Sequence, residues 1–138
     1  MKLDSNLDAK KYSATGNLAA NKITFQKRLD VASIYFSYTS SATVGNRAPR
    51  IQLIDTDGST VIAEWAVGLT QAASLTSKYS GFDGAVLSTS LFSTDLALFP
   101  IPFISISNGM SIKLIDRAAV DAADTATLYV LGNEPAGA

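Results

Sequence analysis

Carboxylates are the side chains of this chain whose spacing first suggests chemistry. Five aspartates fall in two predicted turns: Asp55 and Asp57 in the first, and Asp116, Asp121 and Asp124 in the second. Calcium takes roughly six to eight oxygen ligands and favours loops dense in carboxylates. The second segment, IDRAAVDAAD, places Ala and Val between its aspartates, and Arg117 beside Asp116 indicates an internal ion pair. We therefore favour turn and cap formation, with calcium binding as the alternative.

Catalysis by paired carboxylates is the next possibility. Two carboxyl groups about 5 to 9 Å apart suffice for glycoside hydrolysis. The only glutamates are Glu64 and Glu134. Glu64 stands beside Trp65 on a predicted strand, where it would face either a sugar or solvent. A solvated or salt-bridged strand face is the favoured interpretation.

The chain has neither histidine nor cysteine. It therefore lacks the usual general base near neutral pH, the commonest transition-metal ligand, and any thiolate or disulfide. The serine-nucleophile motif GxSxG and the phosphate-binding motifs GxxxxGK[ST] and GxGxxG are also missing. The sequence predicts a protein that is not an enzyme and that holds no metal or cofactor.

Composition indicates one folded domain. A length of 138 residues suits a single core. The hydrophobic fraction of 47% and charged fraction of 17% argue against disorder, and no apolar run approaches the roughly 20 residues of a membrane span. A net charge of -1 gives no field to attract nucleic acid. We expect no nucleic-acid or membrane partner. Asp4 and Asp8 stand where a secretion signal would be apolar, which predicts folding in the cytoplasm.

Alternating apolar residues predict the strands that position these side chains. In residues 31–38, Ala32 is expected to share one face with Ile34, Phe36 and Tyr38. Asp-Gly between residues 50–55 and 60–67 predicts a hairpin. On its second strand Val61, Ala63, Trp65 and Val67 are predicted to share a face, with Trp65 as a core anchor rather than a ligand platform.

Residues 110–114 and 125–130 also alternate, and we predict that they form a terminal hairpin across the Asp-rich loop. Weaker strands are predicted at residues 18–26, 72–79 and 85–91. Ser93 or Thr94 would cap a single helical turn. Pro100 and Pro102 exclude a central paired strand and suit an edge or a crossover between sheets.

About eight short strands without an ordinary helix predict an all-β fold, an antiparallel two-sheet β-sandwich or jelly roll. The predicted domain spans residues 18–132, between an N-terminal arm at residues 1–17 and a C-terminal tail at residues 133–138. Sheet edges need cover, and outer faces rich in Ser, Thr and Ala would lie closely against other subunits. We therefore expect a homo-oligomer.

Residues 45–66 (GNRAPRIQLIDTDGSTVIAEWA), 70–84 (TQAASLTSKYSGFDG) and 99–132 (FPIPFISISNGMSIKLIDRAAVDAADTATLYVLG) carry a resemblance. Their pattern is Arg47 before an alternating strand, an Asp-Gly hairpin, the segment from Thr70 to Ser74 leading to Tyr79, prolines before an Asn-Gly turn, and an Asp-rich loop before the last strand. This pattern, over about residues 42–131, is similar to the small β-sandwich capsid decoration (cement) proteins of tailed bacteriophages.

The resemblance implies a structural virion protein that sits on the outer capsid surface of the phage head, bridges major capsid protein subunits and stabilises the head against packaged DNA. It also implies a homotrimer. A polar arm would become ordered against a capsid neighbour. We predict Lys10, Lys11 and Tyr12 as capsid-contact residues within that arm.

Two alternatives remain. In a carbohydrate- or receptor-binding β-sandwich module, Trp65, Tyr35, Tyr79 or Phe82 would stack on sugar rings. Another minor head or tail component of the same virion would differ from a decoration protein by its position alone.

Overall fold

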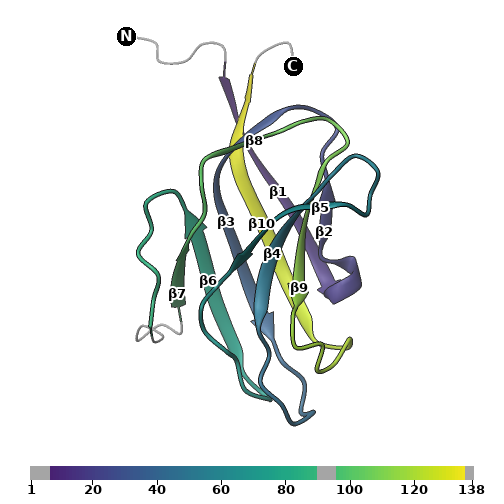
Figure 1. Cartoon of the computed structure of the whole chain (residues 1–138), viewed down its shortest axis with the longest axis vertical. Helices are drawn as coiled ribbons and strands as arrows, with labels where there is room; N and C mark the ends of the chain where they lie inside the picture. Colours follow the sequence, from purple (N-terminus) through teal and green to yellow (C-terminus); the bar gives the residue numbers. More distant parts are fainter. Residues whose placement is uncertain (1–6, 90–95, 136–138) are drawn as a thin grey trace.

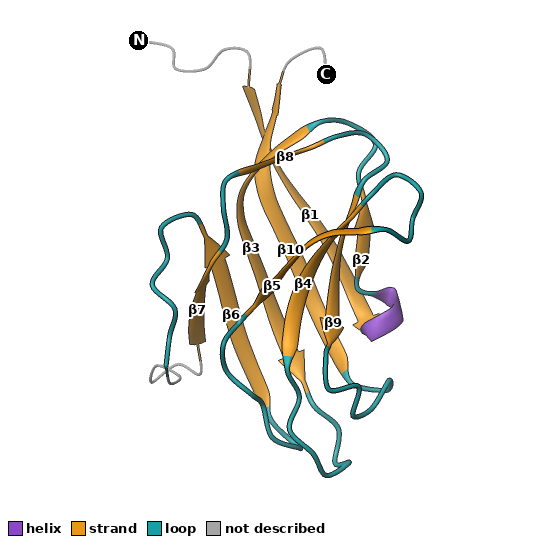
Figure 2. Ribbon diagram, viewed as in Figure 1, coloured by secondary structure: helices purple, strands orange, loops and turns teal. Residues whose placement is uncertain are grey.

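The computed structural model describes residues 7–89 and 96–135, and Figure 2 shows that strands dominate this part of the chain. The strands are β1 (Leu7–Asn17), β2 (Lys22–Thr24), β3 (Leu29–Thr39), β4 (Pro49–Ile54), β5 (Val61–Ala66), β6 (Thr76–Phe82), β7 (Leu96–Pro100), β8 (Ile104–Ile106), β9 (Ser111–Asp116) and β10 (Thr125–Pro135). One turn of 3-10 helix, η1 (Leu18–Ala20), follows β1. The predicted all-β class is confirmed.

Two sheets pack face to face (Figure 1). Sheet A has the order β1-β10-β3-β6-β7, with β8 paired to one end of β3, and sheet B has the order β2-β9-β4-β5. Neighbouring strands are antiparallel except β6 and β7, which run parallel at the edge of sheet A. The predicted two-sheet sandwich is therefore confirmed, with one parallel pair that the alternation of residues does not reveal.

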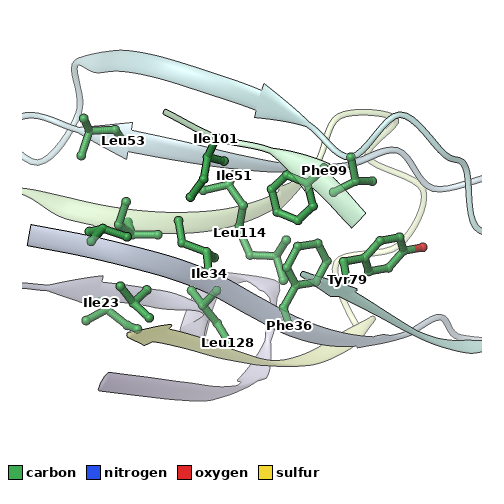
Figure 3. Close-up of a cluster of buried hydrophobic side chains, with 14 of the residues drawn as sticks. Ile23, Ile34, Phe36, Ile51, Leu53, Tyr79, Phe99, Ile101, Leu114 and Leu128 are labelled. Carbon is green, nitrogen blue, oxygen red and sulfur yellow. The ribbon is translucent and has the colours of Figure 1, made fainter. Parts of the chain in front are cut away.

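Side chains from both sheets fill the space between them (Figure 3). Ile34, Phe36 and Leu128 of sheet A are fully buried, as are Ile51 and Leu114 of sheet B. Burying an aliphatic or aromatic side chain of this size stabilises a fold by roughly 1.5–3 kcal/mol. The interior face of each sheet is therefore committed to the core, which leaves the outer faces and the edges for function.

Residues 7–17 form an edge strand, so the predicted arm is wrong for this stretch. β1 pairs with β10 along its whole length, and β10 also takes in residues 133–135 of the predicted tail. Tyr12 and Ala14 pack against the core. The boundary at residue 17 was misplaced because the inward positions Tyr12, Ala14 and Gly16 of β1 give a weak apolar period.

The predicted terminal hairpin is also wrong. β9 pairs with β2 and β4 in sheet B, whereas β10 pairs with β1 and β3 in sheet A. The Asp-rich loop therefore crosses from one sheet to the other. Alternation shows that each strand has one buried face, but it does not identify the neighbouring strand.

Two β-bulges move side chains away from their predicted faces. Ser33 pairs with Leu131 and Val31 with Gly132, so Ala32 is the extra residue of β3 and its side chain is exposed while Val31 is buried. In β5 the extra residue is Ile62. The bulge places Val61 on the face opposite Ala63 and Trp65, because one added residue reverses the alternation.

The weaker predicted strands have mixed outcomes. Residues 18–26 contain η1 and the short β2, and β6 begins at Thr76 rather than at residue 72. Residues 85–89 are not a strand. The remainder of that predicted strand and the possible caps Ser93 and Thr94 lie outside the described residues. Pro100 ends the edge strand β7, as the prolines predicted.

Candidate functional site

The three predicted contact residues lie together on β1. Lys10, Lys11 and Tyr12, with Gln26, Lys27 and Glu134, line a surface hollow of about 360 Å³. The Tyr12 ring meets Phe25 edge-on at 5.1 Å, and its hydroxyl donates to the Glu134 carboxylate. This hydrogen bond, together with burial, raises the pKa of Tyr12 to about 12. Tyr12 is therefore held by its own domain.

Lys11 lies on the opposite face of β1 from Tyr12. Its ammonium group is 5.1 Å from the centroid of the Tyr129 ring, a distance at which a cation is attracted to the aromatic face. Lys10 is exposed. The structure thus brings the three residues to one edge strand. Their contact with a capsid stays a prediction.

The aspartates act within turns. Asp116 accepts hydrogen bonds from the backbone N–H groups of Ala48, Ala118 and Val120. Asp57 accepts from the hydroxyl and the backbone N–H of Thr60, which lower its pKa to about 2. Turn and cap formation is therefore confirmed for Asp57 and Asp116. Among the described residues, no group of three acidic side chains is arranged to hold a metal ion.

Asp121 is tied to the loop that follows β3. Its carboxylate accepts from the Ser41 hydroxyl at 2.6 Å and the Thr43 hydroxyl at 2.9 Å. The Ser41 hydroxyl is the main cause, followed by the Ala123 N–H and the Thr43 hydroxyl, of a lowered pKa of about 2 for Asp121. This carboxylate therefore joins two loops at the same end of the sandwich.

Arg47 and Asp124 form a buried ion pair that sequence reasoning missed. Both side chains are fully inaccessible, with Arg47 Nε 2.9 Å from Asp124 Oδ2 and Nη2 3.1 Å from Oδ1. Arg47 Nη1 also donates to the carbonyl oxygens of Thr43 and Gly45. Arg47 appeared in the resemblance pattern without a predicted partner, and the one ion pair predicted from the sequence was between Asp116 and Arg117. That pairing is wrong, since Arg117 lies 3.9 Å from Glu64.

Asp124 also accepts hydrogen bonds from the Tyr38 hydroxyl at 2.7 Å and the Ser41 N–H at 2.8 Å. Burial alone would raise the pKa of Asp124, but Arg47, Ser41 and Tyr38 together lower it. Burial and the bond to Asp124 raise the pKa of Tyr38. We call Arg47, Asp124, Tyr38 and Ser41 the Arg47 network. It connects sheet A with the loop that leads into sheet B.

Gln71 extends the polar interactions beside this network. Its backbone forms a bridge with Arg47, and its side chain donates to the carbonyl oxygens of Tyr38 and Leu75. The Tyr79 hydroxyl, which points away from the aliphatic side chains in Figure 3, donates to Gln71 Oε1 at 2.9 Å. Each segment that carries the resemblance therefore contributes residues to these polar interactions, namely Arg47, Gln71 with Tyr79, and Asp124.

Glu64 belongs to an ion-pair group on sheet B. It accepts from Arg50 Nη1 at 2.9 Å and from Gln52 Nε2 at 2.8 Å. The bond from Gln52 is the main influence on Glu64, and with Arg50 and Arg117 it outweighs burial and lowers the pKa. The salt-bridged strand face predicted for Glu64 is confirmed.

The aromatic candidates for sugar stacking are dispersed. Tyr79 is 1% exposed, and Trp65 of sheet B is half-buried against the core. Tyr35 and Phe82 share the outer face of sheet A, where the Tyr35 ring lies 5.8 Å from that of Tyr129. Two of the four predicted aromatics therefore lie on one face.

The outer face of sheet A is a broad surface with few charges. The strand pairing and the partial exposure of its members define it as Lys11, Ser13, Thr15, Ser33, Tyr35, Ser37, Lys78, Ser80, Phe82, Leu96, Leu98, Thr127, Tyr129 and Leu131. Lys11 and Lys78 are its charged members. At one end, Thr15, Ser37 and Thr127 belong to the lining of a hollow of about 310 Å³. Hydroxyl groups and aromatic rings thus dominate this surface.

Comparisons with known proteins give weak likenesses. No protein-family model and no curated protein matches the chain. Similar solved structures include the Drosophila NLP core, a protein described for pentamer formation and histone binding, at 11% identity over 93% of this chain and 97% of that chain with a TM-score of 0.40. An exo-β-agarase is 12% identical over 99% of this chain and 24% of that chain, with a TM-score of 0.41.

A structure of the infectious bursal disease virus Gx strain is 14% identical over 96% of this chain and 33% of that chain, with a TM-score of 0.34. Viral capsid proteins are thus among the structural neighbours at low identity. Scores at this level carry no argument about function. The resemblance to tailed-phage decoration proteins stays a prediction. Among the described residues, no helix is long and apolar enough to cross a membrane.

Proposed function

We propose that this chain is a structural virion protein, a capsid decoration protein that binds the outer surface of a phage head and bridges major capsid protein subunits. In this proposal the outer face of sheet A is the surface that contacts the capsid. The protein acts by binding and catalyses no reaction. The sequence resemblance supports the family, and the character of this face supports its use as a contact surface.

The observation that carries the proposal is the difference between the two outer faces. Sheet A presents hydroxyls, Tyr35, Tyr129 and Phe82, whereas sheet B presents an ion-pair group around Glu64. The centres of protein interfaces are depleted in charge and enriched in aromatic residues. Strand spacing gives the sheet A face an extent on the order of 500 Å², comparable to the roughly 800 Å² per partner of a stable interface.

Repetition on the capsid would strengthen such a contact. A single hydroxyl-rich face makes modest interactions, since an average neutral hydrogen bond contributes about 1 kcal/mol. Linked copies that bind neighbouring sites gain effective concentration and hold more tightly than one copy does. On a repeating lattice, a face that binds with moderate affinity is therefore enough to hold a decoration protein on the capsid.

Capsid binding tests the proposal. Purified protein is mixed with heads of the encoding phage that were prepared without it, and saturable binding is measured by co-sedimentation. Ser37→Glu places a carboxylate on the outer face of sheet A, and Ala66→Glu places the same charge on exposed β5 of sheet B. We expect Ser37→Glu to weaken binding roughly tenfold or more and Ala66→Glu to leave it unchanged. Equal binding of the two variants, or no saturable binding of the wild type, would contradict the proposal.

The test uses substitutions because β1 is part of sheet A. Deleting residues 1–17 would remove an edge strand and expose the core beside Tyr12 and Ala14. Loss of binding by the deleted protein would then report unfolding. Circular dichroism of Ser37→Glu and Ala66→Glu verifies that both variants retain the fold.

The second candidate is a carbohydrate-binding module, favoured by the shared placement of Tyr35, Tyr129 and Phe82 on one face. Aromatic rings with a polar end suit ligands that have both apolar and hydroxylated surfaces. A glycan-array signal that Tyr129→Ala removes, combined with no capsid binding, would support this candidate and overturn decoration. Capsid binding without a glycan signal would support decoration.

A further inference from the structure

The free edge of β1 differs from the other three sheet edges. β2 has 3 residues, β7 has 5 and ends at Pro100, and β5 has 6 with a bulge at Ile62. Short strands, prolines, bulges and charged side chains, lysine especially, are the usual means of protecting a sheet edge from pairing. β1 has 11 residues in unbroken register with β10, without a proline or a bulge. Over its length of roughly 36 Å, its outer backbone has no strand partner among the described residues.

The side chains divide this edge into two parts. Lys10 and Lys11 place two adjacent lysines in the first part, whereas Ser13, Ala14 and Thr15 are small and uncharged. Lysines on an edge oppose a partner that brings lysines to the same place. Small neutral side chains allow another strand to approach. A partner strand therefore fits best alongside the stretch from Lys11 to Thr15.

We infer that β1 pairs antiparallel with β1 of a second copy, around a two-fold axis at Ser13. This inference goes beyond the proposed function, since it concerns contact between copies of the chain. In this register Ser13 faces Ser13 of the second copy, Tyr12 faces Ala14, and Lys11 faces Thr15. No two like charges are opposite each other, and each half of the contact repeats the other, as a two-fold interface requires.

The charges oppose registers centred on Tyr12, Lys11 or Lys10, and a register centred on Ala9 or earlier would leave only residues 7–11 of β1 or fewer paired. Pairing centred on Tyr12 would place Lys11 of each copy diagonal to Lys11 of the other, about 7–8 Å apart at the backbone. Pairing centred on Lys11 or Lys10 would place two lysines directly opposite. Like charges at such positions are destabilising. The axis therefore lies beyond Tyr12 in the chain.

Existing hydrogen bonds oppose registers displaced toward the C-terminus of β1. The Asn21 side-chain amide donates to the carbonyl oxygens of Gly16 at 3.0 Å and Asn17 at 2.8 Å. A five-residue contact centred on Ala14 would take in Gly16, and one centred on Thr15 would take in Asn17 as well, although the carbonyl groups of both residues already have a donor. Ser13 is the position that satisfies both conditions.

The two-fold contact would extend sheet A through both copies. An axis normal to the sheet turns the outer faces of both copies to the same side. The charge-poor faces would then be presented together, which suits binding to a repeating lattice. The two-fold unit differs from the homotrimer implied by the resemblance, so the mass in solution distinguishes them.

Cysteine crosslinking tests the axis, because the native chain contains no cysteine. Directly opposed residues of an antiparallel pair have Cα atoms about 4.5–5.5 Å apart, within the range that a disulfide spans. We expect Ser13→Cys to form a covalent dimer under mild oxidation. The control is Ser37→Cys, which lies on the same face but on the interior strand β3. We expect it to remain uncrosslinked at the same protein concentration.

Solution mass supplies an independent measurement. We expect the wild type to reach twice 14.5 kDa as concentration rises in analytical ultracentrifugation. Ser13→Lys, which sets two lysines against each other at the axis, should weaken the dimer roughly tenfold or more, while Ser37→Lys retains it. A single-chain mass at all concentrations, a threefold mass, or equal crosslinking of the two cysteine variants would overturn the inference.

These outcomes are separate from those of the proposed function. Capsid binding that depends on Ser37 but occurs with a monomeric chain would refute the two-fold contact alone. Crosslinking at Ser13 without capsid binding would refute decoration alone.

Discussion

Two arginine–carboxylate pairs in this sandwich share a distance and differ in surroundings. Arg47 and Asp124 are 2.9 Å apart with both side chains 0% exposed, and Arg50 and Glu64 are 2.9 Å apart with 37% and 19% exposed. A buried charge that loses its partner has no water to replace it, whereas an exposed charge is rehydrated. At equal distance, the desolvation of the two charges therefore determines how much stability is lost when the ion pair is broken.

Removing the buried arginine is expected to have the largest effect. Arg47→Met leaves the Asp124 carboxylate in the interior with its main cationic partner gone and also removes the donors to Thr43 and Gly45. Breaking one side of a buried pair destabilises by about 3–5 kcal/mol. Urea denaturation would measure this as a decrease in the free energy of unfolding.

A double variant provides the matched control. Arg47→Met combined with Asp124→Leu removes both charges, and we expect it to recover part of the lost stability, because replacing a complete buried pair with apolar groups is often neutral or favourable. If Arg47→Met lost less than about 1 kcal/mol, the value of an exposed pair, the comparison between buried and exposed pairs would fail.

Acid should weaken the buried pair. The folded pKa of Asp124 is lowered, since Arg47, Ser41 and Tyr38 outweigh burial, and that of Asp121 is about 2. An unfolded aspartate has a pKa near 3.9. The two groups therefore contribute stability above about pH 4 that is lost as the pH falls through their folded pKa values. Urea unfolding between pH 7 and pH 2 would record this loss.

Arg47→Met should reverse the contribution of Asp124 to that pH dependence. Without the arginine, the effect of burial on Asp124 is less opposed, so its folded pKa rises. A folded pKa above the unfolded value makes protonation favour the folded state as the pH falls. Identical acid slopes for the wild type and Arg47→Met would show that Asp124 does not depend on Arg47.

Tyr38→Phe is expected to have an intermediate effect. The variant keeps the ring in the core but removes the hydroxyl that donates to Asp124 at 2.7 Å. Hydrogen bonds to charged groups contribute about 1.5–3 kcal/mol. We expect a loss in this range by urea denaturation, smaller than for Arg47→Met because the ion pair remains. Tyr35→Phe, on the outer face of sheet A, is the control and should change stability little.

Local patterns predicted much of the fold but not its long-range connections. The alternation of Ile34, Phe36 and Tyr38 correctly indicated a strand with one buried face, and Asp-Gly correctly indicated the β4–β5 hairpin. Which strands become neighbours depends on contacts far apart in sequence. That is why β9 and β10 were assigned to one hairpin, although they lie in different sheets.

Arg47 and Asp124 illustrate the same limit for polar side chains. They are 77 residues apart, and each stands among small residues that are typical of loops. The nearest opposite charge to Asp116 in the sequence was Arg117, which suggested the wrong pair. The sequence predicted that the arm containing β1 would become ordered against a neighbouring capsid protein. The neighbour of its inner edge proved to be β10 of the same chain.

The smallest effect is expected for the partly exposed pair of Arg50 and Glu64. Glu64→Gln removes the negative charge beside Arg50 and Arg117 but keeps a side-chain oxygen that accepts from Gln52. Exposed ion pairs typically contribute about 0.2–1 kcal/mol, and salt screens them. We expect a loss within this range at low salt that disappears near 1 M NaCl, whereas the loss in Arg47→Met persists. Glu64→Gln could instead lose as much stability as Arg47→Met, with no decrease of the loss in salt. The partly exposed Glu64 would then depend on its partners as much as the buried Asp124 does.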